Sequence, residues 1–425
     1  MKGCKKLLLL VMVIGLTLSG CGAPPAEEPP AEEPPAEEPA PAPEPVEVPA
    51  APEPPASGYD DGVYRGTYGD VGDQQVSIQF TLTDGVISNV GYRHLFYGAT
   101  DFRQIDEDDP MYPIKLQHDQ VADYLEGKTL SVMDDLYSPG DFVEDIDAFT
   151  GATIRGNKVY SAMMDALNRG VYTPAGAVYK SLPDSYDDGV YRGLYEDGGF
   201  QQLGVQFNLT DGVISDVSYR RLYYVETDFL RIEETDPMYP ITLQHQQIAD
   251  YLEGKPVEDI FDLFMPQDFV EDIDTFSGAT IRGNKVFSAF KDGLNRGVYS
   301  PTDGITTDIG PYPDGRYRGV YSDGGTQQIG IQFSLENGNL TNLTYRYLYY
   351  ANMDFMAMEE GDQMYPITVQ YQQALEYLDG QPLEVIFELY EPGGFVEDID
   401  AYSGATLRAN KLLSAIRDGL NRGIY

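Results

Sequence analysis

Cysteine is almost absent from this sequence. Cys4 and Cys21 are its only two cysteines, and both lie within the first 21 of 425 residues. A disulfide framework, a CxxC zinc site and CxxCH haem attachment all need cysteines that the remaining chain does not contain. The sequence therefore excludes disulfide-stapled scaffolds, zinc ribbons and c-type haem proteins.

Positive charge is also scarce. The chain has 28 Lys and Arg against 69 Asp and Glu, for a net charge of -41. Residues 1–20 contribute +3 and residues 22–56 contribute -9, which leaves -35 for residues 57–425. Such a surface repels nucleic acid and anionic lipid headgroups and favours cationic partners. We therefore expect no nucleic-acid partner.

A long apolar run is missing as well. The stretch from Leu7 to Leu16 is shorter than the roughly 20 residues of a membrane span. A basic head precedes it and a small-residue site ending in cysteine follows it: Lys2, Lys5 and Lys6, then Leu18-Ser19-Gly20-Cys21. This order is typical of a bacterial lipoprotein signal. We expect residues 1–20 to be removed and Cys21 to carry lipid, which would anchor the chain to the cell membrane, facing outside the cytoplasm. An uncleaved anchor is the alternative.

Residues 21–58 are dominated by proline, alanine and glutamate, with PPAEE repeated near their start. This composition cannot bury a core and favours extended polyproline II structure. We expect a disordered tether with a reach on the order of 100 Å.

The rest of the sequence is one unit written three times. The copies span residues 59–172, 186–299 and 312–425; each opens with DG(V/R)YRG and closes with LNRG(V/I)Y. A period near 126 residues is far longer than that of a solenoid repeat. Each copy is long enough to be a domain with its own core.

Each copy contains the same predicted elements. Alternating apolar residues around a central turn predict a β-hairpin at 76–90, 203–219 and 329–345. Segments 117–128, 244–255 and 370–381 are expected to be short helices ended by glycine or its neighbour. A further helix should close each copy, because apolar residues recur there at helical spacing. The predicted fold class is α+β: three tandem copies of a small antiparallel sheet with helices.

The longest near-identical stretch recurs at 142–158, 269–285 and 395–411, and contains Asp-x-x-(Ser/Thr)-Gly-Ala-Thr just before the closing helix. In this motif and its surroundings the chain resembles the FMN-binding domain family. That family includes the C subunit of the sodium-pumping NADH:quinone oxidoreductase, the G subunit of the Rnf complex and multi-flavin lipoproteins of extracellular electron transfer. The resemblance covers each copy from its opening motif to its closing helix.

The resemblance implies three covalent FMN groups, each in a phosphoester bond with the last threonine of a motif: Thr153, Thr280 and Thr406. It implies a maturing flavin transferase that uses FAD and magnesium. It also implies an electron carrier rather than an independent enzyme, with a membrane dehydrogenase or quinone-linked donor and an extracellular acceptor. The other motif residues expected to bind the cofactor are Asp147, Asp274, Asp400, Thr150, Ser277, Ser403, Gly151, Gly278, Gly404, Ala152, Ala279 and Ala405.

The same residues, considered without the resemblance, are compatible with this reading. A helix starting at Thr153 would point free backbone N–H groups and a positive dipole end at a phosphate. The aromatic residues two positions before the motif glycine would flank a flavin ring: Phe149, Phe276 and Tyr402. The family's usual Thr or Ser two positions after the acceptor is replaced by Arg155, Arg282 and Arg408, whose charge would suit a phosphoester. Alternatively, Thr150, Ser277 and Ser403 are only helix N-caps.

Other polar residues are weaker candidates. No histidine recurs in all three copies, since His94 aligns with Arg221 and Tyr347, and His118 with His245 and Tyr371. We therefore expect no metal site and no catalytic residue. The chain also has no GxGxxG for the additional FAD domain of a flavin-linked reductase. The remaining alternative is a cell-envelope binding lipoprotein with three non-redox repeats, which gain avidity from their number.

The signal sequence generates a first prediction. Replacing Cys21 with Ala should release the protein from the membrane fraction or stall its processing, because two acyl chains give stable attachment and none remains. Fractionation and N-terminal sequencing would measure this. Unchanged membrane retention of the variant would contradict the lipoprotein interpretation.

Overall fold

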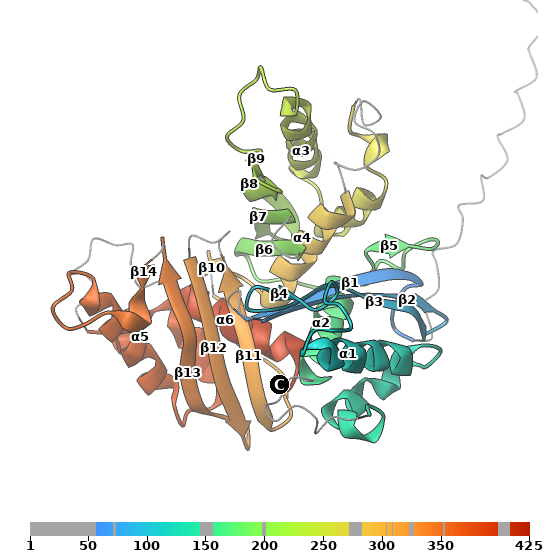
Figure 1. Ribbon diagram of the computed structural model, residues 1–425. Helices are drawn as coiled ribbons and strands as arrows, with labels where there is room; N and C mark the ends of the chain where they lie inside the picture. The colour runs from blue at the N-terminus through green and yellow to red at the C-terminus, as the bar shows by residue number, and fades with distance from the viewer. Residues whose placement is uncertain are drawn as a thin grey trace, which may run out of the picture. The chain divides into compact units, whose positions relative to one another are not determined.

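The computed structural model describes residues 57–70, 74–144, 156–197, 201–271, 283–302, 304–307, 309–322, 327–351, 353–397 and 409–425 (Figure 1). The expected signal, Cys21 and nearly all of the expected tether lie outside these residues. Residues 51–425 form one compact unit. No helix in the described part of the chain is both long and apolar enough to cross a membrane.

The described fold is α+β, as predicted, with three antiparallel sheets. Their strand orders are β4-β3-β2-β1-β5, β10-β6-β7-β8-β9 and β11-β12-β13-β14. The first sheet contains β1 (Gly62–Asp70), β2 (Gln74–Thr83), β3 (Val86–Tyr97), β4 (Thr100–Asp101) and β5 (Thr173–Pro174). The second contains β6 (Gly189–Asp197), β7 (Gln201–Thr210), β8 (Val213–Tyr224), β9 (Thr227–Asp228) and β10 (Ser300–Pro301). The third contains β11 (Gly315–Ser322), β12 (Gln327–Glu336), β13 (Asn339–Tyr350) and β14 (Met353–Asp354).

The helices follow the same threefold order. The longer ones are α1 (Tyr112–Leu125), α2 (Gly156–Arg169), α3 (Tyr239–Leu252), α4 (Gly283–Arg296), α5 (Tyr365–Leu378) and α6 (Ala409–Arg422). The 3-10 helices are η1 (Leu130–Tyr137), η2 (Pro139–Asp141), η4 (Val257–Phe264), η5 (Pro266–Asp268), η7 (Phe355–Ala357), η8 (Leu383–Tyr390) and η9 (Pro392–Gly394).

The predicted hairpin is confirmed in every copy. In the first, Thr83 pairs with Val86, and the two turn residues Asp84 and Gly85 have φ values of 50° and 74°. Two consecutive positive φ values are what a tight two-residue hairpin turn requires, and Asp-Gly supplies them at low cost. The alternation along β2 then buries one face of the strand: Val76, Ile78, Phe80 and Leu82 are at most 4% exposed.

The opening motif, whose structure the sequence pattern did not predict, forms the strand beside this hairpin. Its glycine lies against the closing helix: a Cβ added to Gly66 in β1 would lie 2.0 Å from the carbonyl oxygen of Ala162 in α2. Gly193 and Gly319 lie equally close to α4 and α6. The repeated glycine of the opening motif is therefore explained by backbone-to-backbone packing of strand on helix.

The first helix of each copy begins earlier than predicted. α1 starts at Tyr112 rather than at 117, with Pro113 in its first turn, and it ends at Leu125, before Gly127. Proline suits a first turn because the N–H that it lacks has no partner there. The prediction missed this turn because the polar residues Gln117 and His118 separate its buried residue, Ile114, from the later apolar positions Val121 and Leu125. The closing helices α2, α4 and α6 are confirmed, although their expected first residue, Thr153 in copy one, lies outside the described residues.

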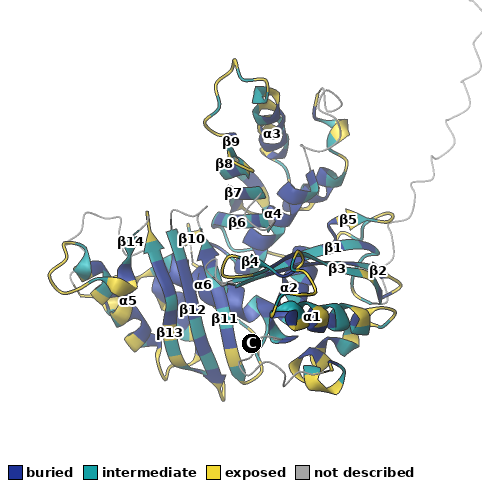
Figure 2. Ribbon diagram, in the orientation of Figure 1, coloured by how far each residue is buried: buried dark blue, intermediate teal, exposed yellow. Residues whose placement is uncertain are grey.

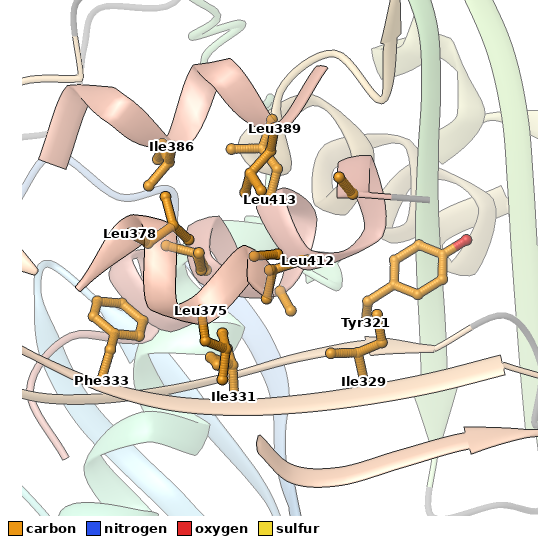
Figure 3. Packing of buried hydrophobic residues seen from close by; sticks show 14 of the residues in the cluster. Tyr321, Ile329, Ile331, Phe333, Leu375, Leu378, Ile386, Leu389, Leu412 and Leu413 are labelled. Atoms are coloured by element: carbon orange, nitrogen blue, oxygen red, sulfur yellow. The ribbon is translucent and has the colours of Figure 1, made fainter. Parts of the chain in front are cut away.

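Each sheet has its own apolar core, formed with its two longer helices. In the third copy, side chains of Ile331 and Phe333 in β12 meet Leu375 of α5 and Leu412 of α6 (Figure 3). Buried positions dominate α4 and α6, buried and intermediate positions alternate along the strands, and α1 and α5 keep an exposed side (Figure 2). The closing helices are buried on almost every side because they also contact one another.

These helix contacts include a closed ring of buried ion pairs. Each closing helix carries an aspartate and, four residues later, an arginine bonded to it at 2.8–2.9 Å. Each arginine also reaches the aspartate of the next copy: Arg169 to Asp292 at 3.6 Å, Arg296 to Asp418 at 2.9 Å, and Arg422 to Asp165 at 3.4 Å. Burial alone would raise the pKa of Asp418, but Arg296 and Arg422 hold this pKa below its ordinary value. The third copy thus closes back onto the first.

Two further sets of contacts repeat around the same ring. The side-chain amides of Asn168, Asn295 and Asn421 each donate to the backbone oxygen of another member of the set. The terminal tyrosine of each copy stacks on a β-strand tyrosine of the next, with ring centroids 5.7–5.9 Å apart: Tyr172 with Tyr195, Tyr299 with Tyr321, and Tyr425 with Tyr68. The closing motif LNRG(V/I)Y therefore joins the copies.

The ring generates a stability prediction. Asp418→Ala should lower the free energy of unfolding by about 3–5 kcal/mol, because it leaves two buried guanidinium groups without their shared carboxylate. Urea unfolding would measure this. The matched control is Asp119→Ala, which breaks the more exposed 2.7 Å pair with Lys115 and should change stability by less than about 1 kcal/mol. Equal effects of the two substitutions would contradict the importance of the ring.

Candidate functional site

The motif residues predicted from the sequence lie outside the described residues. This applies to the three proposed acceptors and to the other predicted cofactor-binding residues of the motif: Thr153, Thr280, Thr406, Asp147, Asp274, Asp400, Thr150, Ser277, Ser403, Gly151, Gly278, Gly404, Ala152, Ala279 and Ala405. It also applies to Phe149, Phe276, Tyr402, Arg155, Arg282 and Arg408. The site is therefore built here from the described residues that flank the motif on both sides.

Both ends of the motif segment are held by described elements. On the upstream side, the backbone N–H of Glu271 donates to Gln247 of α3 at 2.8 Å. Glu144 and Glu397 make the same bond to Gln120 and Gln373, at 2.7 and 3.0 Å. On the downstream side, α4 begins at Gly283, three residues after Thr280. In the second copy, the motif segment therefore lies in the sequence between Glu271, which is bonded to α3, and Gly283, at which α4 begins.

A cavity lies between these two helices and the sheet. In the second copy it has a volume of about 100 Å³, and its walls come from β7, β8, α3 and the first turn of α4. Most of its lining is apolar or aromatic, as in Leu203, Leu222, Phe229 and Ile241. Small-molecule sites commonly combine such walls with a few polar groups.

The third copy has the same cavity at the equivalent positions. It has a volume of about 210 Å³, with Ile329, Leu348, Phe355 and Ile367 in place of the four residues above. Because two copies form the cavity from aligned residues, it belongs to the repeated unit and not to an accident of packing in one copy.

One polar pair recurs at this cavity. Lys285 and Gln201 line it in the second copy, and Lys411 and Gln327 line it in the third. In each copy the lysine Nζ donates to the glutamine Oε1, including Lys158 to Gln74 in the first. The three lysines are 3–8% exposed. Each stands five residues after a proposed acceptor threonine, so the pair brings a buried cation beside the motif.

The cavity also holds a neutral imidazole in the second copy. Burial and the nearby charge of Lys285 lower the pKa of His245 to about 3. In the first copy burial lowers the pKa of His118 to about 4. This lowering prevails over the opposite effect of a 2.9 Å hydrogen bond that Nδ1 of His118 donates to the Ile114 oxygen. Tyr371 occupies the same position in the third copy. The position is thus a histidine of lowered pKa in two copies and a tyrosine in the third, which fits a packing role better than a proton-transfer role.

Aromatic residues stand at the open side of the cavity. Tyr223 and Tyr224 line it in the second copy, and Tyr349 and Tyr350 in the third. The outer residue of each pair is strongly exposed, 41% for Tyr224 and 40% for Tyr350, and Tyr97 at the aligned position is 48% exposed. Tyrosines that are exposed at a cavity mouth are suited to stack on a planar ring.

Sequence reasoning missed the lysine and glutamine of this site. Both residue types occur mostly on protein surfaces, so the sequence did not predict that these residues would be buried beside a cavity. A signal was available, because the lysine of (G/A)NK and the glutamine pair before the hairpin are identical in all three copies. The asparagine of (G/A)NK has a different role: Asn284 donates to the Tyr172 oxygen of the preceding copy at 2.8 Å.

No group of three or more His, Cys, Asp or Glu suited to a metal ion occurs within the described ranges. Comparison of the chain with family models, with curated proteins and with solved structures finds no match. The features of this chain that bear on function are therefore the repeated motif and the cavity lined by the helix that follows it.

The buried histidines generate a prediction about pH. Their pKa values are lower in the folded chain than the ordinary 6.5, so the stability that they contribute is complete above about pH 6.5 and falls as the pH drops toward 4. The double variant His118→Tyr and His245→Tyr copies Tyr371 of the third repeat and removes both groups. Between these pH values its stability should fall less steeply than that of the parent, by at most about 1.4 kcal/mol per pH unit for each histidine.

Unfolding midpoints measured at several pH values would check this expectation. At pH 8 the parent and the double variant should differ little, which serves as the internal control. If the unfolding midpoints of the parent and the double variant fell equally from pH 8 to pH 4, the expectation would be contradicted.

Proposed function

We propose that this protein is a membrane-anchored electron carrier outside the cytoplasm, with FMN bound covalently at Thr153, Thr280 and Thr406. The single observation that carries the proposal is a cavity with apolar walls, exposed tyrosines and a buried lysine from the first turn of the helix that follows the acceptor motif, in matching form in the second and third copies. The first copy has the same lysine and glutamine in hydrogen-bond contact.

The residues present fit the proposed group. A flavin ring is planar and largely apolar, with one edge of carbonyl and nitrogen atoms that accept and donate hydrogen bonds. The cavity offers apolar walls for such a ring, and Lys285 and Gln201 offer a cation and an amide for its polar edge. The cavities of about 100 and 210 Å³, with Tyr224 or Tyr350 in their lining, would hold part of such a ring system.

FMN, when bound, supplies the capacity to accept electrons singly or in pairs, and the protein sets its position and surroundings. The apolar walls would exclude water from one face of the ring, while the exposed tyrosines leave a route to a partner at the other. A phosphoester to threonine would prevent loss of the cofactor in a compartment that cannot resupply it. On this proposal the chain needs no catalytic residue of its own.

The proposed cellular setting follows from the sequence. A lipid on Cys21 would hold the chain at the membrane, and the tether would carry residues 57–425 toward an extracellular acceptor. Electrons would come from a membrane dehydrogenase or a quinone-linked donor, and a flavin transferase would install FMN from FAD with magnesium. The net charge of -35 favours partners with a cationic docking face.

The ring of ion pairs bears on how three flavins would cooperate. Each closing helix contacts the other two, so each copy has both other copies as neighbours. A linear relay would make the second flavin special, whereas a ring gives the three sites equivalent places. We therefore expect the loss of any one flavin to reduce electron transfer by a similar fraction.

The prediction concerns the acceptor threonines. After co-expression with a flavin transferase, the intact mass should show three FMN adducts, and Thr153→Ala, Thr280→Ala or Thr406→Ala should each remove one. Fluorescence in a denaturing gel would report the same covalent flavin. Stability should change by only about 1 kcal/mol, the usual value of a hydroxyl at a helix start.

The triple variant is the decisive control. It should be folded, colourless and unable to pass electrons to an acceptor. Full electron transfer by the triple variant, or a parent protein that stays colourless beside an active transferase, would overturn the proposal. The binding lipoprotein with three non-redox repeats would then take its place.

A further inference from the structure

We infer that the buried lysine of each copy (Lys158, Lys285 and Lys411) sets the reduction potential of the flavin in that copy, by placing its ammonium group at the polar edge of the ring. This inference rests on the proposed function and assigns to these lysines a role that differs from attachment. They are positioning and tuning residues, since the acceptor bond is made elsewhere.

The geometry leaves little freedom for the ammonium group. Lys285 lies in the first turn of α4, where its side chain is enclosed, and its Nζ donates to Gln201 at the start of β7. Both residues line the cavity. A lysine fixed between a helix and a strand in this way cannot follow a ligand outward, so it presents its charge at one place in the cavity wall.

The charge of the lysine affects a neighbouring side chain in the cavity. His245, which lines the same cavity, has its pKa lowered by burial and then by Lys285, and His118 is affected in the same direction by Lys158. A ring that enters the cavity would lie in the same field. Charges interact more strongly there than in water because the surroundings are less polarisable.

The chemistry of reduction connects this field to the potential. Uptake of two electrons and one proton from the donor side leaves a flavin ring with one negative charge, which resides mainly on the pyrimidine edge. A cation at that edge stabilises the reduced form more than the oxidised form. Cofactor potentials are generally adjusted by such charges, so the lysine should make the potential more positive than it would be in a neutral cavity.

The experiment isolates one flavin. In the full-length chain carrying Thr153→Ala and Thr406→Ala, only Thr280 can accept FMN, and the midpoint potential of that flavin is measured by spectroelectrochemistry. Lys285→Met and, separately, Gln201→Glu are added to this background. The first removes the cation and the second sets a carboxylate against it, so both should shift the potential to more negative values.

Two matched controls accompany these variants. Lys285→Arg keeps the charge and should keep the potential close to the parent value. Lys255→Met removes a lysine of the same copy that lies over Tyr251 at the end of α3, 4.1 Å from the ring centroid, and should leave the potential unchanged.

The outcomes separate this inference from the proposed function. One FMN adduct with an unchanged potential in both Lys285→Met and Gln201→Glu would overturn the tuning role and leave the flavin carrier intact. Equal shifts in Lys255→Met would also overturn it, because any surface charge would then suffice. The absence of an adduct in the background with Lys285 present would instead remove the proposed function. If Lys285→Met does not fold, the midpoint potential of Gln201→Glu is the measurement that tests the tuning role.

Discussion

A buried guanidinium is tolerated only where opposite charge and hydrogen-bond acceptors surround it, and this requirement organises the described part of the chain. Arg169, Arg296 and Arg422 each take one carboxylate from their own helix and one from the next copy. Each aspartate in turn accepts a backbone N–H from the first strand of its own copy, as Asp165 does from Thr67 at 2.8 Å. Each aspartate is therefore bonded to a strand of its own sheet, to its own closing helix and to a neighbouring copy. The first turns of α4 and α6 each contribute a lysine to the wall of a site cavity.

The two ends of each closing helix have different tasks. The first turn carries Lys285 into the cavity and Asn284 toward the preceding copy, while the last turn carries Asn295 and Arg296 into the ring. This division explains why the repeated stretches of the sequence cluster around these helices. A residue that is identical in three copies can be retained for assembly as well as for a ligand. The adjacent asparagine and lysine of (G/A)NK differ in this way: Asn284 bonds to the preceding copy, whereas Lys285 lines the cavity.

Local features of the fold were predictable from the sequence. The hairpin at Asp84-Gly85 and the closing helices follow from turn chemistry and periodicity, which act over a few residues. The start of α1 at Tyr112 was missed because polar residues separate Ile114 of its first turn from Val121 and Leu125. The strand of the opening motif and the ion-pair ring were missed for another reason. Asp165 and Asp292 are equivalent residues of separate copies. The sequence of one copy alone does not indicate that its arginine contacts the aspartate of the next copy. The lysine and glutamine of the site, 84 residues apart, are another pair that only the fold brings together.

The contacts that join the copies have one more consequence, which concerns the links between them. An interface that joins the end of one unit to the side of the next does not distinguish a neighbour in the same chain from one in another chain. What favours closure within the chain is the effective concentration imposed by the short connections at 173–185 and 300–311, which reaches the millimolar range for linkers of this kind. Lengthening either connection beyond its paired strand, β5 or β10, would weaken that preference without changing the ion pairs of the ring. The protein would then exchange copies between molecules at high density, as on a crowded membrane surface. The short length of these segments thus favours a ring formed by the three copies of a single chain.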